Sequence, residues 1–208
     1  MTTTRLEAFT DGVFAIAITL LVIELRPPDL EEGERLASAL WQLWPNYLAY
    51  LVSFLNIGVM WMNHHRMFAQ VVRVDGTLLV LNLALLLCAA FIPFPTAVVA
   101  EHLREGGEAA STALALYGGV ILLTACAFTA LFAWITHDDH LLDRQVPAPV
   151  VRASRVRFSI GLAAYAMAFG LSWVSAPLAL ALHAAMAGYY AFDQATVPAA
   201  DEVAAGAA

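Results

Sequence analysis

The sequence predicts an all-α membrane protein with six transmembrane helices per subunit, and three observations support this prediction. Hydrophobic residues make up 61% of the 208 residues, and the mean hydropathy is +0.73. Charged residues make up only 13%, whereas soluble domains are about a quarter charged. Long stretches lack any Asp, Glu, Lys or Arg, as expected of segments that cross a bilayer, where a buried charge is costly.

The first helix is predicted over about residues 4–25. Its uninterrupted apolar core is short, because Asp11 and Glu24 flank it. A short apolar segment at the N-terminus could instead be a signal peptide. However, Glu7 and Asp11 occupy the region where a signal peptide carries positive charge, and no small-residue cleavage site follows. We therefore expect this segment to be retained as the first membrane span.

The other five helices follow from the charge-free stretches. Three stretches, 36–65, 76–100 and 109–137, can each hold one helix of the ~20 residues needed to cross a bilayer. The stretch 158–192 would form a helix of about 50 Å, too long for one span, and Pro177 divides it into two. The predicted helices are about 40–64, 76–100, 109–136, 156–174 and 177–193, followed by a disordered cytoplasmic tail over 195–208.

The arginines predict the orientation in the membrane. All basic residues are Arg, and six alternating spans place seven of the ten on one side and three on the other. The larger group is Arg5, Arg66, Arg73, Arg144, Arg152, Arg155 and Arg157, and the smaller is Arg26, Arg35 and Arg104. Basic loops stay in the cytoplasm. We therefore expect a multi-pass plasma membrane protein with both termini in the cytoplasm.

Several function classes are disfavoured by the sequence. The net charge of -7 argues against nucleic-acid binding. The sequence contains no Ser/His/Asp set, paired intramembrane carboxylates or phosphate-binding loop, so we expect no enzyme activity, resident metal or cofactor. Polar side chains at membrane depth, namely Asn46, Asn56, Asn82 and His183, are expected to form hydrogen bonds with neighbouring helices.

One face of the first helix is continuous and apolar. Ile16, Leu20 and Ile23 follow at i, i+4 and i+7, with Gly12 and Thr19 at the margins of this face. Periodicity alone is compatible with a packing seam between helices. Asp11 lies roughly opposite Ile16, so it should point into the protein and find a partner such as Trp61, His64, His65 or an Arg. A structural contact with the second and third helices is the preferred role of Asp11, and gating or proton sensing with a histidine is the alternative.

A motif in the first helix resembles a known family. The string Arg5-x-x-x-Phe9-Thr10-Asp11, followed by Gly-Val-Phe-Ala-Ile-Ala-Ile-Thr-Leu-Leu, resembles the Arg-x-x-x-Phe-Ser-Asp opening of the transmembrane protein 175 family of potassium channels. The second predicted helix carries Trp61-Met-Asn-His64-His65, which is similar to the Trp and His pattern of the prokaryotic members. Thr10 stands where the family usually has Ser, and this difference keeps the hydroxyl group.

The resemblance implies a homotetramer in which the first helices line a central pore. It implies that Ile16, Leu20 and Ile23 form a hydrophobic constriction, with Thr19 and Gly12 beside it. It gives a structural role to the motif residues Arg5, Phe9, Thr10, Asp11, Trp61, His64 and His65. The expected permeant ion is potassium, without a backbone-carbonyl selectivity filter or a cofactor. The expected partners are other copies of the chain, membrane lipid and monovalent cations.

Two other classes of membrane protein are the alternatives. A secondary transporter usually has broken helices and ionisable groups near the bilayer midplane, whereas the charges here lie at the ends of the predicted spans. A membrane scaffold has no need of an apolar stripe on a short first helix.

Overall fold

The computed structural model describes residues 2–30, 33–137, 141–142 and 148–196, and these residues form eight helices. The helices are α1 (Thr3–Ile23), α2 (Leu36–Gln42), α3 (Trp44–Phe68), α4 (Gly76–Phe91), α5 (Pro93–His102), α6 (Gly107–Ile135), α7 (Ala148–Leu171) and α8 (Ala176–Thr196). The described part of the chain contains no β-strand beyond one isolated bridge between Val71 and Leu142. The predicted all-α class is therefore confirmed.

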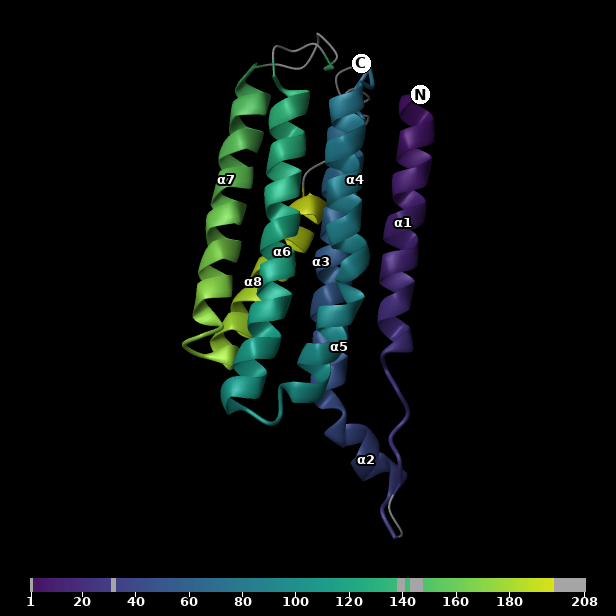
Figure 1. The fold of residues 1–208 in the computed structure, drawn as a ribbon, viewed down its shortest axis with the longest axis vertical. Helices are drawn as coiled ribbons and strands as arrows, with labels where there is room; N and C mark the ends of the chain where they lie inside the picture. The colour runs from purple at the N-terminus through teal and green to yellow at the C-terminus, as the bar shows by residue number, and fades with distance from the viewer. Residues whose placement is uncertain (1, 31–32, 138–140, 143–147, 197–208) are drawn as a thin grey trace.

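The helices form an elongated bundle with α1 at one edge (Figure 1). α1 packs against α3, α4 and α5, whereas α6 lies inside the bundle and packs against α4, α5, α7 and α8. α7 stands at the edge opposite α1 (Figure 1). The large side chains that are fully buried, including Phe14, Leu85, Leu114 and Leu131, form one continuous hydrophobic core across these helices.

The two ends of the bundle differ in the charges that they carry. The beginnings of α1, α4 and α7 lie at the same end as the end of α6 (Figure 1), so we call this the arginine-rich end. The loop between α3 and α4, with Arg73, joins helices at this end, and Arg152 and Arg155 lie in the first turns of α7. Arg35 and Arg104 lie next to α2 and α5, at the other end (Figure 1).

The single helix predicted over 76–100 is wrong in detail, because the structure divides it into α4 and α5 at Ile92. Pro93 is the first residue of α5 and lacks the N–H group that a continuous helix needs. The carbonyl oxygen of Ala89, to which residue 93 would donate in a continuous helix, accepts instead from the backbone N–H of Ile92 at 3.2 Å. The break therefore leaves this buried region hydrogen-bonded.

Other helix ends also differ from the predicted ones. Residues 40–42 belong to the separate helix α2, and α3 runs from Trp44 to Phe68 with Pro45 in its first turn. α7 begins at Ala148 instead of about 156, so three arginines lie within the helix. Charged side chains at the end of an apolar segment do not stop a helix. A prediction based on charge-free stretches therefore made α7 too short. Most of the predicted tail lies outside the described residues, and 195–196 still belong to α8.

Three segments in the described part of the chain are long and apolar enough to cross a membrane: α1, α4 with α5, and α6. The apolar part of α8, Ala176–Phe192, is shorter. α7 carries Arg152, Arg155 and Arg157, which lower its hydropathy. The predicted number of six spans is therefore not confirmed by these criteria and stays a prediction.

Candidate functional site

One face of α1 is not covered by any other part of the described chain. The side chains of Ile16, Leu20 and Ile23 are 61%, 40% and 67% exposed, and we call these three residues the exposed stripe. The opposite face is buried through Leu6, Thr10, Phe14, Ala17 and Leu21. Large apolar side chains with this exposure usually contact lipid, a partner or a pathway outside the single chain. The structure therefore separates a packing face of α1 from a free apolar face.

Two small uncharged residues, Gly12 and Thr19, flank the exposed stripe. Gly12 is exposed, and a β-carbon added there would meet no atom within 4 Å. The hydroxyl of Thr19 lies 2.9 Å from the carbonyl oxygens of both Ala15 and Ile16. This local bond satisfies the hydroxyl hydrogen of Thr19 within its own helix and leaves the oxygen available as an acceptor.

Asp11 connects α1 to α3. The indole Nε1 of Trp61 donates a 2.9 Å hydrogen bond to the Oδ1 oxygen of Asp11. Trp61 was one of the partners expected for Asp11, and this contact is confirmed. Asp11 is nevertheless exposed in the single chain, so the expectation that it points into the protein is wrong. At about 100° of rotation per residue, Asp11 and Ile16 lie about 140° apart around the axis of α1. Asp11 therefore lies off the exposed stripe, and its hydrogen bond with Trp61 places it at the margin between α1 and α3.

A groove lies along the same margin between α1 and α3. Its volume is about 320 Å³, and its lining comprises Asp11, Phe14, Ala15, Ile18, Gly58 and Trp61. The groove is shallow and mainly apolar, with the hydrogen-bonded pair of Asp11 and Trp61 as its polar part. The exposed surface of α1 therefore continues from the stripe toward α3.

Thr10 takes part in a buried polar triad that joins three helices. The Nδ2 atom of Asn82 on α4 donates a 2.9 Å hydrogen bond to the hydroxyl oxygen of Thr10 on α1. The Oδ1 atom of Asn82 lies 2.9 Å from Nε2 of His64 on α3. Because Oδ1 can only accept, Nε2 of His64 carries the proton in this arrangement. All three side chains are at most 1% exposed, so the triad fixes α1 against α3 and α4.

The remaining motif residues lie outside this triad. His65 is exposed and stacks on Trp61 at 6.0 Å, whereas His64, the member of the triad, stacks on Phe68 at 4.0 Å. Phe9 is half exposed. Arg5 is exposed and has no hydrogen-bond or ion-pair partner among the residues described. The structure therefore brings Thr10, Asp11, Trp61 and His64 into contact networks, but it does not bring Arg5 or Phe9 into them.

A second polar network lies deeper in the bundle, between α3, α5, α6 and α7. Asn56 donates to the hydroxyl of Tyr117 at 3.1 Å and accepts from the hydroxyl of Tyr165 at 3.4 Å. Ser53 lies 2.8 Å from the hydroxyl of Thr96 and donates to Tyr117 at 3.2 Å. The expected interhelical hydrogen bonds of Asn56 and Asn82 are therefore confirmed.

His183 does not follow this expectation. Its side chain on α8 is fully buried, and neither ring nitrogen has a hydrogen-bond partner in the part of the chain that the structure describes. Its ring instead packs edge-on against Tyr117 and stacks on Tyr165, at centroid distances of 5.1 and 6.0 Å. Aromatic packing rather than hydrogen bonding therefore holds His183 in place.

Sequence reasoning missed two structural roles. Asn82 was recognised only as a polar group at membrane depth, although it connects Thr10 with His64. Asp75 was not singled out; it accepts from the backbone N–H of Leu78 at 2.7 Å and from the indole of Trp134. An Asp directly before an apolar helix is a recognisable N-cap signal, whereas the contact with Trp134 requires the tertiary structure.

The described part of the chain offers no candidate metal centre. No group of three or more His, Cys, Asp or Glu side chains that could hold a metal ion occurs within the described ranges. The loop after α6 includes residues 138–140, which lie outside those ranges. The chemistry of the candidate site is therefore that of an apolar face supported by buried hydrogen bonds.

Comparisons with known proteins agree with these features. The family model described as the endosomal/lysosomal potassium channel TMEM175 matches residues 5–93. A Streptomyces collinus protein named a potassium channel is 50% identical over 194 residues, which are 93% of this chain and 94% of that protein. A Chamaesiphon minutus protein, also named a potassium channel, is 42% identical over 191 residues, which are 91% of this chain and 93% of that protein.

The fold is also similar to that of a solved structure. The crystal structure described as a lysosomal potassium-selective channel TMEM175 homolog from Chamaesiphon minutus aligns with a TM-score of 0.83. The two chains are 41% identical, and the alignment covers 92% of this chain and 97% of the other. The likeness therefore extends over most of the chain and not only over the first-helix motif.

Proposed function

Because this chain belongs to the TMEM175 family, we propose that it is a potassium-permeable cation channel whose first helix lines the ion pathway. The observation that carries the proposal is the exposed stripe. Ile16, Leu20 and Ile23 form a continuous apolar face that the rest of the chain leaves open. The family relation supports a pathway as the role of this face, whereas helical periodicity alone is equally compatible with a packing seam.

The proposed assembly is a homotetramer around a central axis. Four copies of α1 with their exposed stripes toward the axis would produce three apolar rings about 10 Å from first to last, at 1.5 Å per residue. The groove between α1 and α3 lies on the flank of the stripe, so a neighbouring copy could cover it. A ring at Ile16 would be the narrowest point, with Leu20 and Ile23 outside it and Thr19 and Gly12 beside it.

Such a constriction would act on hydrated ions. An apolar ring gives a cation no ligands to replace its water, so the cost of dehydration decides which ions pass. Potassium holds water less tightly than sodium, so potassium would be favoured. The sequence contains no Thr-Val-Gly-Tyr-Gly string. The nearest glycine pair, Gly118 and Gly119, faces Phe169 of α7, and this packing supports a channel without a carbonyl filter.

We place the channel in the plasma membrane with the arginine-rich end and both termini in the cytoplasm. The distribution of Arg residues supports this orientation. The partners in this proposal are other copies of the chain, lipid and monovalent cations. The named relatives are channels and not enzymes, so we propose no catalytic activity and no cofactor.

Replacement of Ile16 by Asn tests the assignment. The amide would give a partly dehydrated cation hydrogen-bonding ligands at the proposed ring, so current should rise and the preference for potassium over sodium should fall. The matched control is Ile160→Asn on α7, because Ile160 is 62% exposed, nearly the same as Ile16 at 61%. The current and the preference for potassium over sodium are measured on protein reconstituted in planar bilayers.

Three results would count against the proposal. Unchanged conductance and ion preference in Ile16→Asn, with assembly intact, would make the stripe a packing seam. Slow flux without unitary current steps in the unmodified protein would favour a secondary transporter, and no flux at all would favour a scaffold.

A further inference from the structure

A cavity of about 260 Å³ opens near the arginine-rich end, away from the exposed stripe. It lies between the last turns of α3, the end of α6 and the first half of α7. Its polar lining comprises Asn63, Arg66, Gln70, Thr136, Ser154 and Arg157. Phe132, Ile135 and Phe158 contribute an apolar wall. The cavity therefore combines two guanidinium groups with neutral hydrogen-bonding groups on an apolar support.

The two arginines that line the cavity come from different depths of the bundle. Arg66 lies two residues before the end of α3, whereas Arg157 lies nine residues after the start of α7. At 1.5 Å per residue, Arg157 is about 13 Å along its helix. Arg157 thus stands at the beginning of the predicted span over 156–174, and Arg66 stands at the end of α3, so both guanidinium groups lie near the arginine-rich end of the bundle, where lipid headgroups are found.

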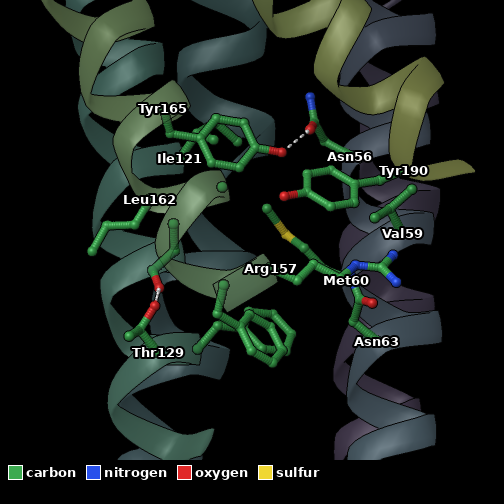
Figure 2. A pocket seen from close by; sticks show the side chains of 14 residues that line it. Asn56, Val59, Met60, Asn63, Ile121, Thr129, Arg157, Leu162, Tyr165 and Tyr190 are labelled. Carbon is green, nitrogen blue, oxygen red and sulfur yellow. Dashed lines mark hydrogen bonds between the residues drawn. The ribbon is translucent and has the colours of Figure 1, made fainter. Parts of the chain in front are cut away.

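Arg157 also connects this cavity with a second, smaller one. The second cavity has a volume of about 60 Å³ and shares Asn63, Arg157 and Phe158 with the first. Figure 2 shows the guanidinium of Arg157 beside Asn63 and near Tyr190, and its central carbon lies 5.3 Å from the centre of the Tyr190 ring. This cation–π contact helps to hold the guanidinium between the two cavities.

The chemistry of this arrangement suits a phosphate group. A guanidinium is a planar donor that matches the geometry of phosphate oxygens, and it stays charged at any physiological pH. Arg155 adds a third guanidinium at the rim, where it donates to the hydroxyl of Thr136 at 3.4 Å. Basic pockets between membrane helices near the cytoplasmic surface bind anionic lipid headgroups.

We propose that this cavity binds the phosphate of an anionic phospholipid headgroup, with Arg66 and Arg157 as the principal ligands. The acyl chains would lie outside, because the inner cavity is too small for them. The proposal requires that the chain lie in a membrane, but it does not require ion conduction. Failure of lipid binding would therefore leave the channel assignment standing.

Native mass spectrometry of the purified full chain in detergent tests this proposal. The protein is incubated with equal amounts of dioleoylphosphatidylglycerol, which is anionic, and dioleoylphosphatidylcholine, which carries the same acyl chains and no net charge. The unmodified protein should retain the anionic lipid preferentially. Arg66→Gln and Arg157→Gln should each reduce that preference about tenfold, since each removes a charge-assisted hydrogen bond.

Arg152→Gln is the matched control. Arg152 also lies in α7, but it lines a separate surface groove with Pro149, Ala153 and Val156, so its loss should leave lipid preference unchanged. Arg157→Lys keeps the charge and should recover part of the preference. Arg157→Lys therefore keeps the test valid if Arg157→Gln misfolds. Arg66→Gln, near the end of α3, measures the lipid preference independently of Arg157.

Three results would overturn the proposal. Equal retention of the two lipids would remove the preference for an anion, and a loss in Arg152→Gln as large as in Arg66→Gln would make the effect one of total charge. Displacement of the lipid by millimolar inorganic phosphate would assign the cavity to free phosphate. Preferential retention that phosphate does not displace, and that depends on both cavity arginines, would assign it to the lipid.

Discussion

Thr10 on α1 and Asn82 on α4 are joined by a buried hydrogen bond of 2.9 Å, although 72 residues separate them in the chain. The same amide contacts His64 of α3 at 2.9 Å. The face of α1 that carries this bond is opposite the exposed stripe. The bond therefore fixes the direction in which the stripe points.

The first prediction concerns this bond. Thr10→Val keeps the shape of the side chain but removes the hydroxyl, which leaves the amide of Asn82 without its acceptor. We expect a loss of about 1 kcal/mol of stability, the usual scale for such bonds between membrane helices. Thr10→Ser keeps the hydroxyl and serves as the control. Thermal unfolding measures the stability of the two purified variants. Equal melting temperatures of the Val and Ser variants would contradict the prediction.

The second prediction concerns the contact between α1 and α3. Asp11→Ala and Trp61→Phe each remove one partner of the 2.9 Å hydrogen bond, so both should reduce the recovery of assembled protein in size-exclusion chromatography. The double variant should lose no more than the more damaging single variant, because both changes break the same bond. Normal assembly of Asp11→Ala with a changed ion preference would instead place Asp11 in the pathway.

Two adjacent glycines on α6 provide the third prediction. A β-carbon at Gly118 would lie 3.2 Å from Nε2 of His183 and 3.3 Å from the Cα atom of Phe169, whereas at Gly119 the nearest atom is 3.5 Å away. Gly118→Ala should therefore cost about 1–3 kcal/mol through overpacking. Gly119→Ala should be neutral or stabilise the helix by up to about 1 kcal/mol. Comparison of their melting temperatures checks this, and a more harmful Gly119→Ala would refute it.

A fourth prediction concerns the contact of α7 with α8. A β-carbon at Gly161 would lie 2.5 Å from the hydroxyl oxygen of Tyr190 but 3.5 Å from the ring carbon that carries it. Gly161→Ala should lower the melting temperature, because Tyr190 must move. Tyr190→Phe removes the clashing oxygen, so the double variant should be more stable than Gly161→Ala alone. Lack of rescue would show that the hydroxyl oxygen of Tyr190 is not the source of the destabilisation.

The fifth prediction is the topology. In a background in which Cys88 and Cys126 are replaced by Ala, single cysteines are introduced at Glu105 and at Val72, both of which are exposed. A membrane-impermeant thiol reagent applied to intact cells should label Glu105→Cys and should leave Val72→Cys unlabelled until the cells are opened. The reverse pattern would place the arginine-rich end outside.

The helical class, the apolar face of α1 and the family could be predicted from the sequence, because they depend on local composition, periodicity and a contiguous motif. Ile16, Leu20 and Ile23 share a face on any regular helix. The split at Pro93 could also have been read from the sequence, since proline lacks the N–H group that a continuous helix requires. The earlier start of α7 was harder to predict from the sequence, because arginines are compatible with both a helix and a loop.

The burial of each helix face and the pairing of the polar groups became known from the three-dimensional packing. Asn82 pairs with Thr10 and His64, whereas the fully buried His183 packs against Tyr117 and Tyr165. Arg66 and Arg157 are far apart in the chain, yet they line one cavity. Local sequence sets the rotation of each side chain about its own helix axis, but the rotation of one helix relative to another depends on the packing of the whole bundle.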